Sequence, residues 1–166
     1  RELPNGDDTN RKTPLHPPAA WRRDWLARTK ELIDRYQPDH MYFDGAIPFA
    51  GDDNGKTGTE LIAHYYNQSM KRHGGRLEGV MCSKWIQDHG ILLKGATTID
   101  YERGRADRIL PQPWQTDTSI GPWFWTRGAR YRSATQIIHE LADIVSKNGN
   151  LLLNVPPKAD GTLDKN

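Results

Sequence analysis

The chain alternates between stretches whose apolar residues recur at helical spacing and short runs that are apolar throughout. The first helical stretch covers about residues 20–36. Pro38 stops it, because the residue before a proline is pushed out of the helical region. Residues 1–18 precede this helix as a proline-rich loop without apolar periodicity. The apolar face of the predicted helix consists of Trp25, Thr29, Leu32, Ile33 and Tyr36.

Two later helices are predicted by the same periodicity, and each begins with a capping box. In that motif a hydroxyl accepts a backbone N–H, and a carboxylate or amide three residues later accepts the N–H of the capping residue. Glycines that follow the apolar pattern predict where both helices end. The defining residues are Thr57, Glu60 and Gly74-Gly75 for the earlier helix, and Ser133, Gln136 and Gly149 for the later one.

Four short runs between the helices predict β-strands. Strand, helix and strand at this spacing form a βαβ unit, for which parallel pairing is the default. The last run is almost wholly apolar and suits a parallel sheet that is covered on both faces. Residues 45–58 predict a loop rich in Gly and Asp, and residues 110–130 predict an irregular stretch rich in Trp. The four predicted strands are "HMYFD" (40–44), "LEGVMCS" (77–83), "GATTIDYE" (95–102) and "NLLLNV" (150–155).

Two α/β architectures fit this order of elements: an open doubly wound sheet and part of a (β/α)8 TIM-type barrel. No Gly-rich phosphate fingerprint follows any predicted strand, which weakens the nucleotide-binding form of the open sheet. In a barrel, catalytic acids are expected at the carboxyl ends of the strands. Asp44 and Glu102 both match that placement.

Composition narrows the class of protein. The chain has 166 residues, of which 36% are apolar and 27% charged, as in a globular domain rather than a disordered segment. The net charge is +2 and the basic residues are scattered, so we expect no nucleic-acid partner. No run approaches the roughly 20 apolar residues of a membrane span, and residues 1–18 lack the apolar core of a signal peptide. The single cysteine, Cys82, excludes a disulfide within the chain.

Asp44 and Glu102 are the leading candidates for chemistry. They follow different predicted strands, so they are able to face one cavity. Two carboxyl groups flanking a bond are what glycoside hydrolysis needs: one attacks the anomeric carbon or activates water, and the other protonates the leaving oxygen. The alternative is that each acid caps a turn or pairs with an arginine.

The remaining chemistry-bearing residues give weaker patterns. The histidines are dispersed, and "GDDNG" (51–55) lacks the rest of a calcium loop, so we expect no metal and no cofactor. Neither Ser119 nor Cys82 has the sequence setting of a catalytic nucleophile. Aromatic rings in loops either stack on sugars or fill the core. Four tryptophans lie in predicted loops or at strand ends: Trp85, Trp114, Trp123 and Trp125.

Four motifs in this order resemble glycoside hydrolase family 29, the retaining α-L-fucosidases. The resemblance covers roughly residues 20–164, and the first and last motifs are the most diagnostic. The motifs are "PDHMYFDG", "TTIDYERG", "PWQTDTSIGPWFW" and "GNLLLNVPPKADGTL".

The resemblance implies roles for both acids. The nucleophile of the family, the Asp of the "DG" strand end, falls on Asp44. In one subgroup the general acid/base is a Glu directly after a Trp, where this chain has Trp114-Gln115, and an amide cannot donate a titrating proton. The chain is similar to the other subgroup, whose acid/base is the Glu of "E-R-G" and falls on Glu102. Members of that subgroup prefer α-1,3/1,4-linked fucose.

Further positions are implied in sugar binding. Tyr42 lies two residues before Asp44, so strand alternation puts it on the same side, where the family uses an aromatic in the fucose pocket. Lys84-Trp85 falls where many members carry Arg-Trp, and the lysine keeps the charge but loses the planar fork. Trp123 falls on the aromatic residue of the family's "S-W-G-Y"-like stretch.

The resemblance also implies a (β/α)8 barrel, of which this chain has only the later part. Only about 40 residues precede the Asp44 strand, so we expect residues 1–166 to form a partial catalytic domain, from about the fourth strand to the eighth, with the β/α repeats over 19–166. The expected enzyme is secreted or periplasmic, acts on fucosylated oligosaccharides or glycoconjugates, and has an oligomeric state that the sequence does not specify; the fragment alone need not be active. The alternatives are another retaining barrel glycosidase and a non-catalytic glycan-binding fragment.

Overall fold

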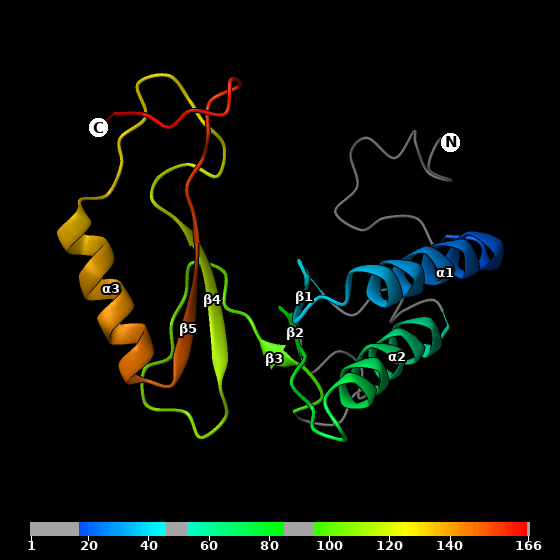
Figure 1. The fold of residues 1–166 in the computed structure, drawn as a ribbon. Coiled ribbons are helices and arrows are strands. Elements are labelled where there is room, and N and C mark those ends of the chain that lie inside the picture. The colour runs from blue at the N-terminus through cyan, green and yellow to red at the C-terminus, as the bar shows by residue number, and fades with distance from the viewer. Residues whose placement is uncertain (1–16, 46–52, 85–94, 166) are drawn as a thin grey trace. The chain divides into compact units, whose positions relative to one another are not determined.

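The computed structural model describes residues 17–45, 53–84 and 95–165. The chain divides into two compact units, residues 1–97 and 98–166, and each is described by itself (Figure 1). Both units contain helices together with parallel strands. This arrangement confirms the predicted α/β class and the predicted parallel pairing.

The first unit consists of two strands and two helices that alternate along the chain. They are α1 (Ala19–Tyr36), β1 (His40–Phe43), α2 (Lys56–Arg72) and β2 (Val80–Ser83). The strands pair in parallel, with His40 opposite Val80 and Phe43 opposite Ser83. Parallel strands need a crossover connection, which α2 supplies here.

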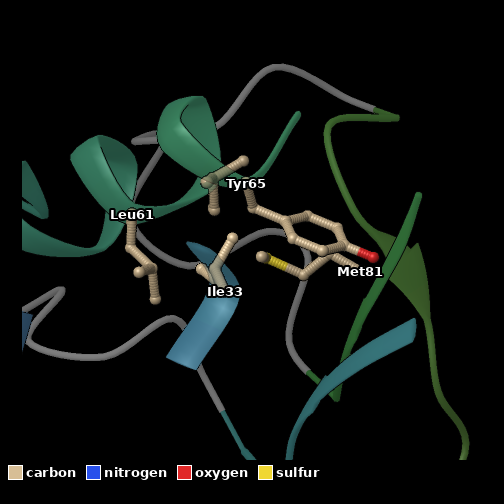
Figure 2. Close-up of a cluster of buried hydrophobic side chains, with 5 residues drawn as sticks. Ile33, Leu61, Tyr65 and Met81 are labelled. Atoms are coloured by element: carbon tan, nitrogen blue, oxygen red, sulfur yellow. The ribbon is translucent and has the colours of Figure 1, made fainter. Parts of the chain in front are cut away.

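The core of the first unit lies between the two helices and the strand pair. Figure 2 shows Ile33 of α1, Leu61 and Tyr65 of α2 and Met81 of β2 gathered in one cluster. The Tyr65 hydroxyl donates to the Val80 carbonyl at 3.2 Å, so the polar end of the ring is satisfied. Burial of each aliphatic side chain in such a cluster contributes about 1.5–3 kcal/mol.

The predicted helix over 20–36 is confirmed, but its predicted apolar face is only partly buried. Ile33 is fully buried, whereas Leu32 and Tyr36 are exposed, the latter by 70%. Leu26, which the prediction left out, packs against the core together with Trp25. The buried stripe therefore includes Trp25, Leu26 and Ile33 but neither Leu32 nor Tyr36.

The capping box predicted at Thr57 and Glu60 is wrong. The capping residue of α2 is Gly55, in the left-handed conformation. Asp53 takes the place of a capping side chain, because its carboxylate accepts both the backbone N–H and the hydroxyl of Thr57. Glu60 forms an ion pair with Lys30 of α1 at 2.6 Å instead.

The second unit holds the remaining elements. They are β3 (Thr98–Ile99), β4 (Trp114–Ser119), α3 (Ala134–Ser146) and β5 (Gly149–Asn154). β4 and β5 pair in parallel over their whole length, and a parallel bridge joins Asp100 to Gln115 of β4. The capping box of α3 is confirmed, with Ser133 and Gln136 each bonded to the backbone of the other.

The strand β4 lies inside the stretch that was predicted to be irregular. All six of its residues are buried, although only Trp114 is strongly apolar. Trp114 packs against Ile144 and Tyr101, and its indole N–H donates to the Lys147 carbonyl at 2.9 Å. Gly149 permits this packing, because a Cβ at that position would lie 2.5 Å from the Trp114 ring.

The prediction that "NLLLNV" is covered on both faces is wrong for the described part of the second unit. Leu151 packs towards Ile144 of α3, and strand alternation turns Leu152 to the opposite face, where it is 41% exposed. Two large apolar side chains of α3, Ile138 and Val145, are also exposed within the described residues. In β5, therefore, the face with Leu151 packs against α3, whereas the face with Leu152 is partly exposed.

Candidate functional site

Asp44 lies directly after β1, where the chain leaves the strand. Gly45, at φ 136°, turns the backbone there, and its N–H donates to the Phe43 carbonyl at 2.9 Å. The Lys84 N–H donates to the Gly45 carbonyl at 2.9 Å, so the ends of β1 and β2 stay together beyond the paired strands. The backbone thus fixes Asp44 at the carboxyl end of a parallel strand pair, as predicted.

Lys84 forms an ion pair with Asp44. Its Nζ lies 2.7 Å from Asp44 Oδ1, and the lysine side chain is only 12% exposed whereas the aspartate is 76% exposed. A partly buried cation therefore holds an accessible carboxylate. The arrangement places a positive charge beside the Asp44 carboxylate and leaves that carboxylate open to a reactant.

Tyr42 faces away from the helical core of the first unit. Its neighbours Met41 and Phe43 pack against that core, so alternation turns Tyr42 to the other face, alongside its register partner Cys82. The prediction that Tyr42 shares a side with Asp44 agrees with this alternation. A sugar-binding role for Tyr42 stays a prediction.

Cys82 is buried and lies beside a histidine. Its Sγ is 3.3 Å from Nε2 of His40, a neighbour that the sequence spacing did not indicate. Burial in a strand is typical of a structural thiol rather than a nucleophile. Trp85, which was predicted to bind substrate, lies outside the described residues.

Glu102 lies on an exposed turn that follows β3 in the second unit. The Gly104 N–H donates to the Tyr101 carbonyl at 3.3 Å, which closes the turn. The Thr116 hydroxyl lies 2.7 Å from the Tyr101 carbonyl and 2.8 Å from the Gly104 carbonyl, and it shares its proton between them. Strand β4 thus holds both ends of the turn that carries Glu102.

Arg103 joins this turn to the loop after β4. Its guanidinium lies over the Trp123 ring, 4.3 Å from the ring centroid, and donates to the Gly121 carbonyl at 3.2 Å. The Trp123 carbonyl accepts from the Asn154 amide at 2.9 Å. Two residues that were predicted for the site, Glu102 and Trp123, are therefore connected through Arg103.

Gln115 is a buried structural residue. Its amide N–H donates to Asp100 Oδ2 at 2.8 Å, and its carbonyl oxygen accepts from the Asn150 amide at 3.1 Å. Both ends of the amide are therefore used inside the fold. This agrees with the prediction that Gln115 is not the general acid.

Trp125 belongs to a polar cluster around Asp164. The Asp164 carboxylate accepts from the Tyr131 hydroxyl at 2.7 Å and from the Trp125 indole at 2.9 Å, and it pairs with Lys158 at 3.1 Å. The hydrogen bond from Tyr131, followed by the one from Lys158, lowers the pKa of Asp164. The same hydrogen bond raises the pKa of Tyr131. Trp125 thus anchors the C-terminal segment.

The described residues hold neither a cluster of metal-ligating side chains nor a membrane-spanning helix. In residues 17–45, 53–84 and 95–165, no group of three or more His, Cys, Asp or Glu side chains is arranged to hold a metal ion. Among the helices of the same residues, none is both long and apolar enough to span a membrane.

Comparison with known proteins identifies the family. A family model described as alpha-L-fucosidase matches residues 3–166. The chain belongs to the alpha-L-fucosidase family. It is 28% identical over 143 residues to the plasma alpha-L-fucosidase of Pongo abelii, and the match covers 83% of this chain and 29% of that protein.

Solved structures of alpha-L-fucosidases share the fold. One is similar with a TM-score of 0.67 and 28% identity, over 89% of this chain and 31% of that one. The Thermotoga maritima alpha-fucosidase in complex with fucose has a TM-score of 0.62 and 26% identity, over 89% of this chain and 30% of that one. The chain thus spans about a third or less of the length of the alpha-L-fucosidases that it matches.

The sequence of this family member did not indicate Thr116 or Arg103 as residues that support the site. Arg103 stands next to Glu102 in "ERG", but its left-handed backbone, at φ 50°, is unusual for a residue with a side chain. Thr116 lies in the unpredicted strand β4. Asp44 and Glu102 belong to separate units, so their pairing stays a prediction.

Proposed function

We propose that the natural protein containing this chain is an exo-acting α-L-fucosidase that releases terminal α-1,3/1,4-linked fucose from glycans with retention of configuration. The observation that carries the proposal is Asp44, an accessible carboxylate at the end of a parallel strand, paired with Lys84 at 2.7 Å. It occurs in a chain that the alpha-L-fucosidase family model matches over residues 3–166.

In the first step, an oxygen of ionised Asp44 attacks the anomeric carbon of fucose. The bond from that carbon to the glycan oxygen breaks, and the departing oxygen takes a proton from Glu102. The product is a fucosyl ester of Asp44. Lys84 stabilises the negative charge of Asp44 before this attack, and again when the charge returns to Asp44 in the second step.

In the second step, water attacks the same carbon from the opposite side. Glu102, now ionised, takes the proton of the water, and the ester bond to Asp44 breaks with its electrons returning to the carboxylate. Both acids regain their starting protonation states. Two inversions give net retention.

This mechanism requires the two carboxyl groups to lie about 5–5.5 Å apart, as in retaining pairs generally. We propose that both units belong to one (β/α)8 barrel, in which strand ends converge on one face. The parallel β1–β2 and β4–β5 pairs support this proposal. So does the likeness to alpha-L-fucosidase structures.

The linkage preference rests on which residue is the acid. Gln115 is an amide bonded to Asp100 and Asn150, which leaves Glu102 in the role it has in the α-1,3/1,4-selective subgroup. A fucosylated oligosaccharide or glycoconjugate is then the substrate. Such substrates are met outside the cytoplasm, so we propose a secreted or periplasmic protein. The name of the matched plasma alpha-L-fucosidase is consistent with this location.

Removal of the Asp44 carboxylate tests the nucleophile. In the natural protein that contains this chain, Asp44→Gly is expected to abolish turnover of an aryl fucoside, and added azide is expected to restore it by attacking in place of the carboxylate. Asp107→Gly is a matched control, because Asp107 is an exposed aspartate outside the site. Full activity of Asp44→Gly without azide would refute the assignment.

Product analysis separates the rival functions. A panel of aryl glycosides distinguishes a fucosidase from a retaining glycosidase for another sugar, and proton NMR of the first-formed fucose reports retention or inversion. Glycan binding without hydrolysis of any substrate would favour a non-catalytic role. We expect hydrolysis of α-L-fucosides alone, with the α-anomer released first.

A further inference from the structure

Several contacts from one stretch of chain, residues 116–123, hold the turn that carries Glu102. The Thr116 hydroxyl bonds the carbonyls of Tyr101 and Gly104. The Arg103 N–H donates to the Asp117 carbonyl at 2.8 Å. Glu102 lies between these fixed points, so the turn cannot move independently of β4.

Arg103 also contacts this stretch with its side chain. The guanidinium stacks on Trp123 at 4.3 Å and donates to the Gly121 carbonyl at 3.2 Å. A left-handed backbone at a residue with a side chain persists only where surrounding contacts determine it. The contacts of Arg103 to Asp117, Gly121 and Trp123 provide that determination.

The stack also changes the interpretation of Trp123. Arg103 covers one face of the indole ring, so a sugar has only the other face available for stacking. The backbone of Trp123 is itself fixed, because its carbonyl accepts from Asn154 of β5. The position of Trp123 is therefore fixed, and the Arg103 guanidinium packs against its ring.

We propose that Arg103 is a positioning residue, which fixes the orientation of Glu102 by bracing its turn against Trp123. This inference rests on the proposed function, in which Glu102 is the general acid. A planar guanidinium can stack and donate at once, whereas a lysine ammonium cannot reproduce both contacts. Small displacements of an acid reduce proton transfer strongly, since catalysis depends on near-ideal geometry.

The test is a series of aryl fucosides whose leaving groups differ in basicity, measured with the natural protein and with Arg103→Ala, Arg103→Lys and Trp123→Leu. A poor leaving group needs a proton from the acid, and an activated one does not. We expect kcat/KM to fall about 10–100-fold for the poorest leaving groups and less than about threefold for the most activated. Arg108→Lys is the matched control, because Arg108 is an exposed arginine of the same unit.

The double variant Arg103→Ala/Trp123→Leu tests the bracing directly. If Arg103 acts through Trp123, the double variant is no worse than the poorer single variant. Losses that multiply, or that are equal for all leaving groups, would overturn the proposal, as would a fully active Arg103→Ala. Thermal unfolding reports whether Arg103→Ala folds. If it does not, Arg103→Lys, which conserves the charge, takes its place in the test. An inactive natural protein would instead refute the proposed function.

Discussion

The ammonium of Lys84 lies 2.7 Å from Asp44 Oδ1, and this contact joins the residues that follow β1 and β2. An ion pair with an exposed partner contributes little to folding, about 0–1 kcal/mol. The lysine is nevertheless largely withdrawn from solvent, at 12% exposure. We interpret this arrangement as serving the charge of Asp44 rather than the stability of the first unit.

Replacement of Lys84 by Met is therefore expected to separate activity from stability. A hydrogen bond to a charged group contributes about 1.5–3 kcal/mol, and solvent access to Asp44 reduces this, so kcat/KM should fall about tenfold or more. The free energy of unfolding should change by less than about 1 kcal/mol. Steady-state kinetics and urea denaturation measure the two effects.

Lys71→Met is the control for Lys84→Met, because Lys71 is an exposed lysine of α2. The control should match the natural protein in both measurements. Equal activity of Lys84→Met and the natural protein would show that the cation does not assist Asp44.

Conversion of Gln115 to Glu is expected to destabilise the second unit without creating a new acid. The Gln115 amide donates to Asp100, whereas an ionised glutamate has no donor and would face that carboxylate at hydrogen-bonding distance. We expect a loss of about 1–3 kcal/mol in the free energy of unfolding and no gain in kcat/KM. The exposed Gln112→Glu serves as control, with a change within about 0.5 kcal/mol. A more active or equally stable Gln115→Glu would contradict this account.

The sequence predicted those elements whose signals are local. The capping box of α3 needs only Ser133 and Gln136, and the structure confirms it. The strand β4 escaped prediction because its residues are mostly polar and its partner, β5, lies far along the chain. Gln115 illustrates the reason: its polarity is satisfied by Asp100 and Asn150, which no local pattern reveals.

The same distinction applies to the candidate site. Asp44 was predictable, because an apolar run ending in Asp-Gly marks the end of a strand. The partnership of Lys84 with Asp44 was not, because it depends on the parallel register that places the ends of β1 and β2 together. The stack of Arg103 on Trp123 likewise depends on a left-handed backbone that the sequence does not indicate.

The cluster of Tyr131 and Asp164 predicts a pH window for the anchoring of the C-terminal segment. The Asp164 pKa is lowered, so the stability that ionised Asp164 contributes is present above the unfolded pKa of about 4. This stability is lost as the pH falls through the folded pKa. The Tyr131 pKa is raised, so the stability that protonated Tyr131 contributes is present below the unfolded pKa of about 10. This stability is lost as the pH rises through the folded pKa.

Ultraviolet titration of phenolate measures this window. The difference between the natural protein and Tyr131→Phe isolates Tyr131, which should ionise above about pH 10. In Asp164→Asn the titration should move back towards the ordinary tyrosine value, because the carboxylate that holds the phenolic proton is gone. An unchanged titration in Asp164→Asn would show that the hydrogen bond between the two residues does not form in solution.

The most direct test of the central claim is to identify the residue that becomes fucosylated. A 2-deoxy-2-fluoro-fucoside with a good leaving group slows hydrolysis of the covalent intermediate, because fluorine at C2 disfavours the positively charged transition state. The natural protein that contains this chain is incubated with this reagent, digested and mapped by mass spectrometry. We predict one added fluorofucosyl group on Asp44. A label on any other residue, or rapid turnover of ordinary fucosides with no label and with inverted product, would contradict the account.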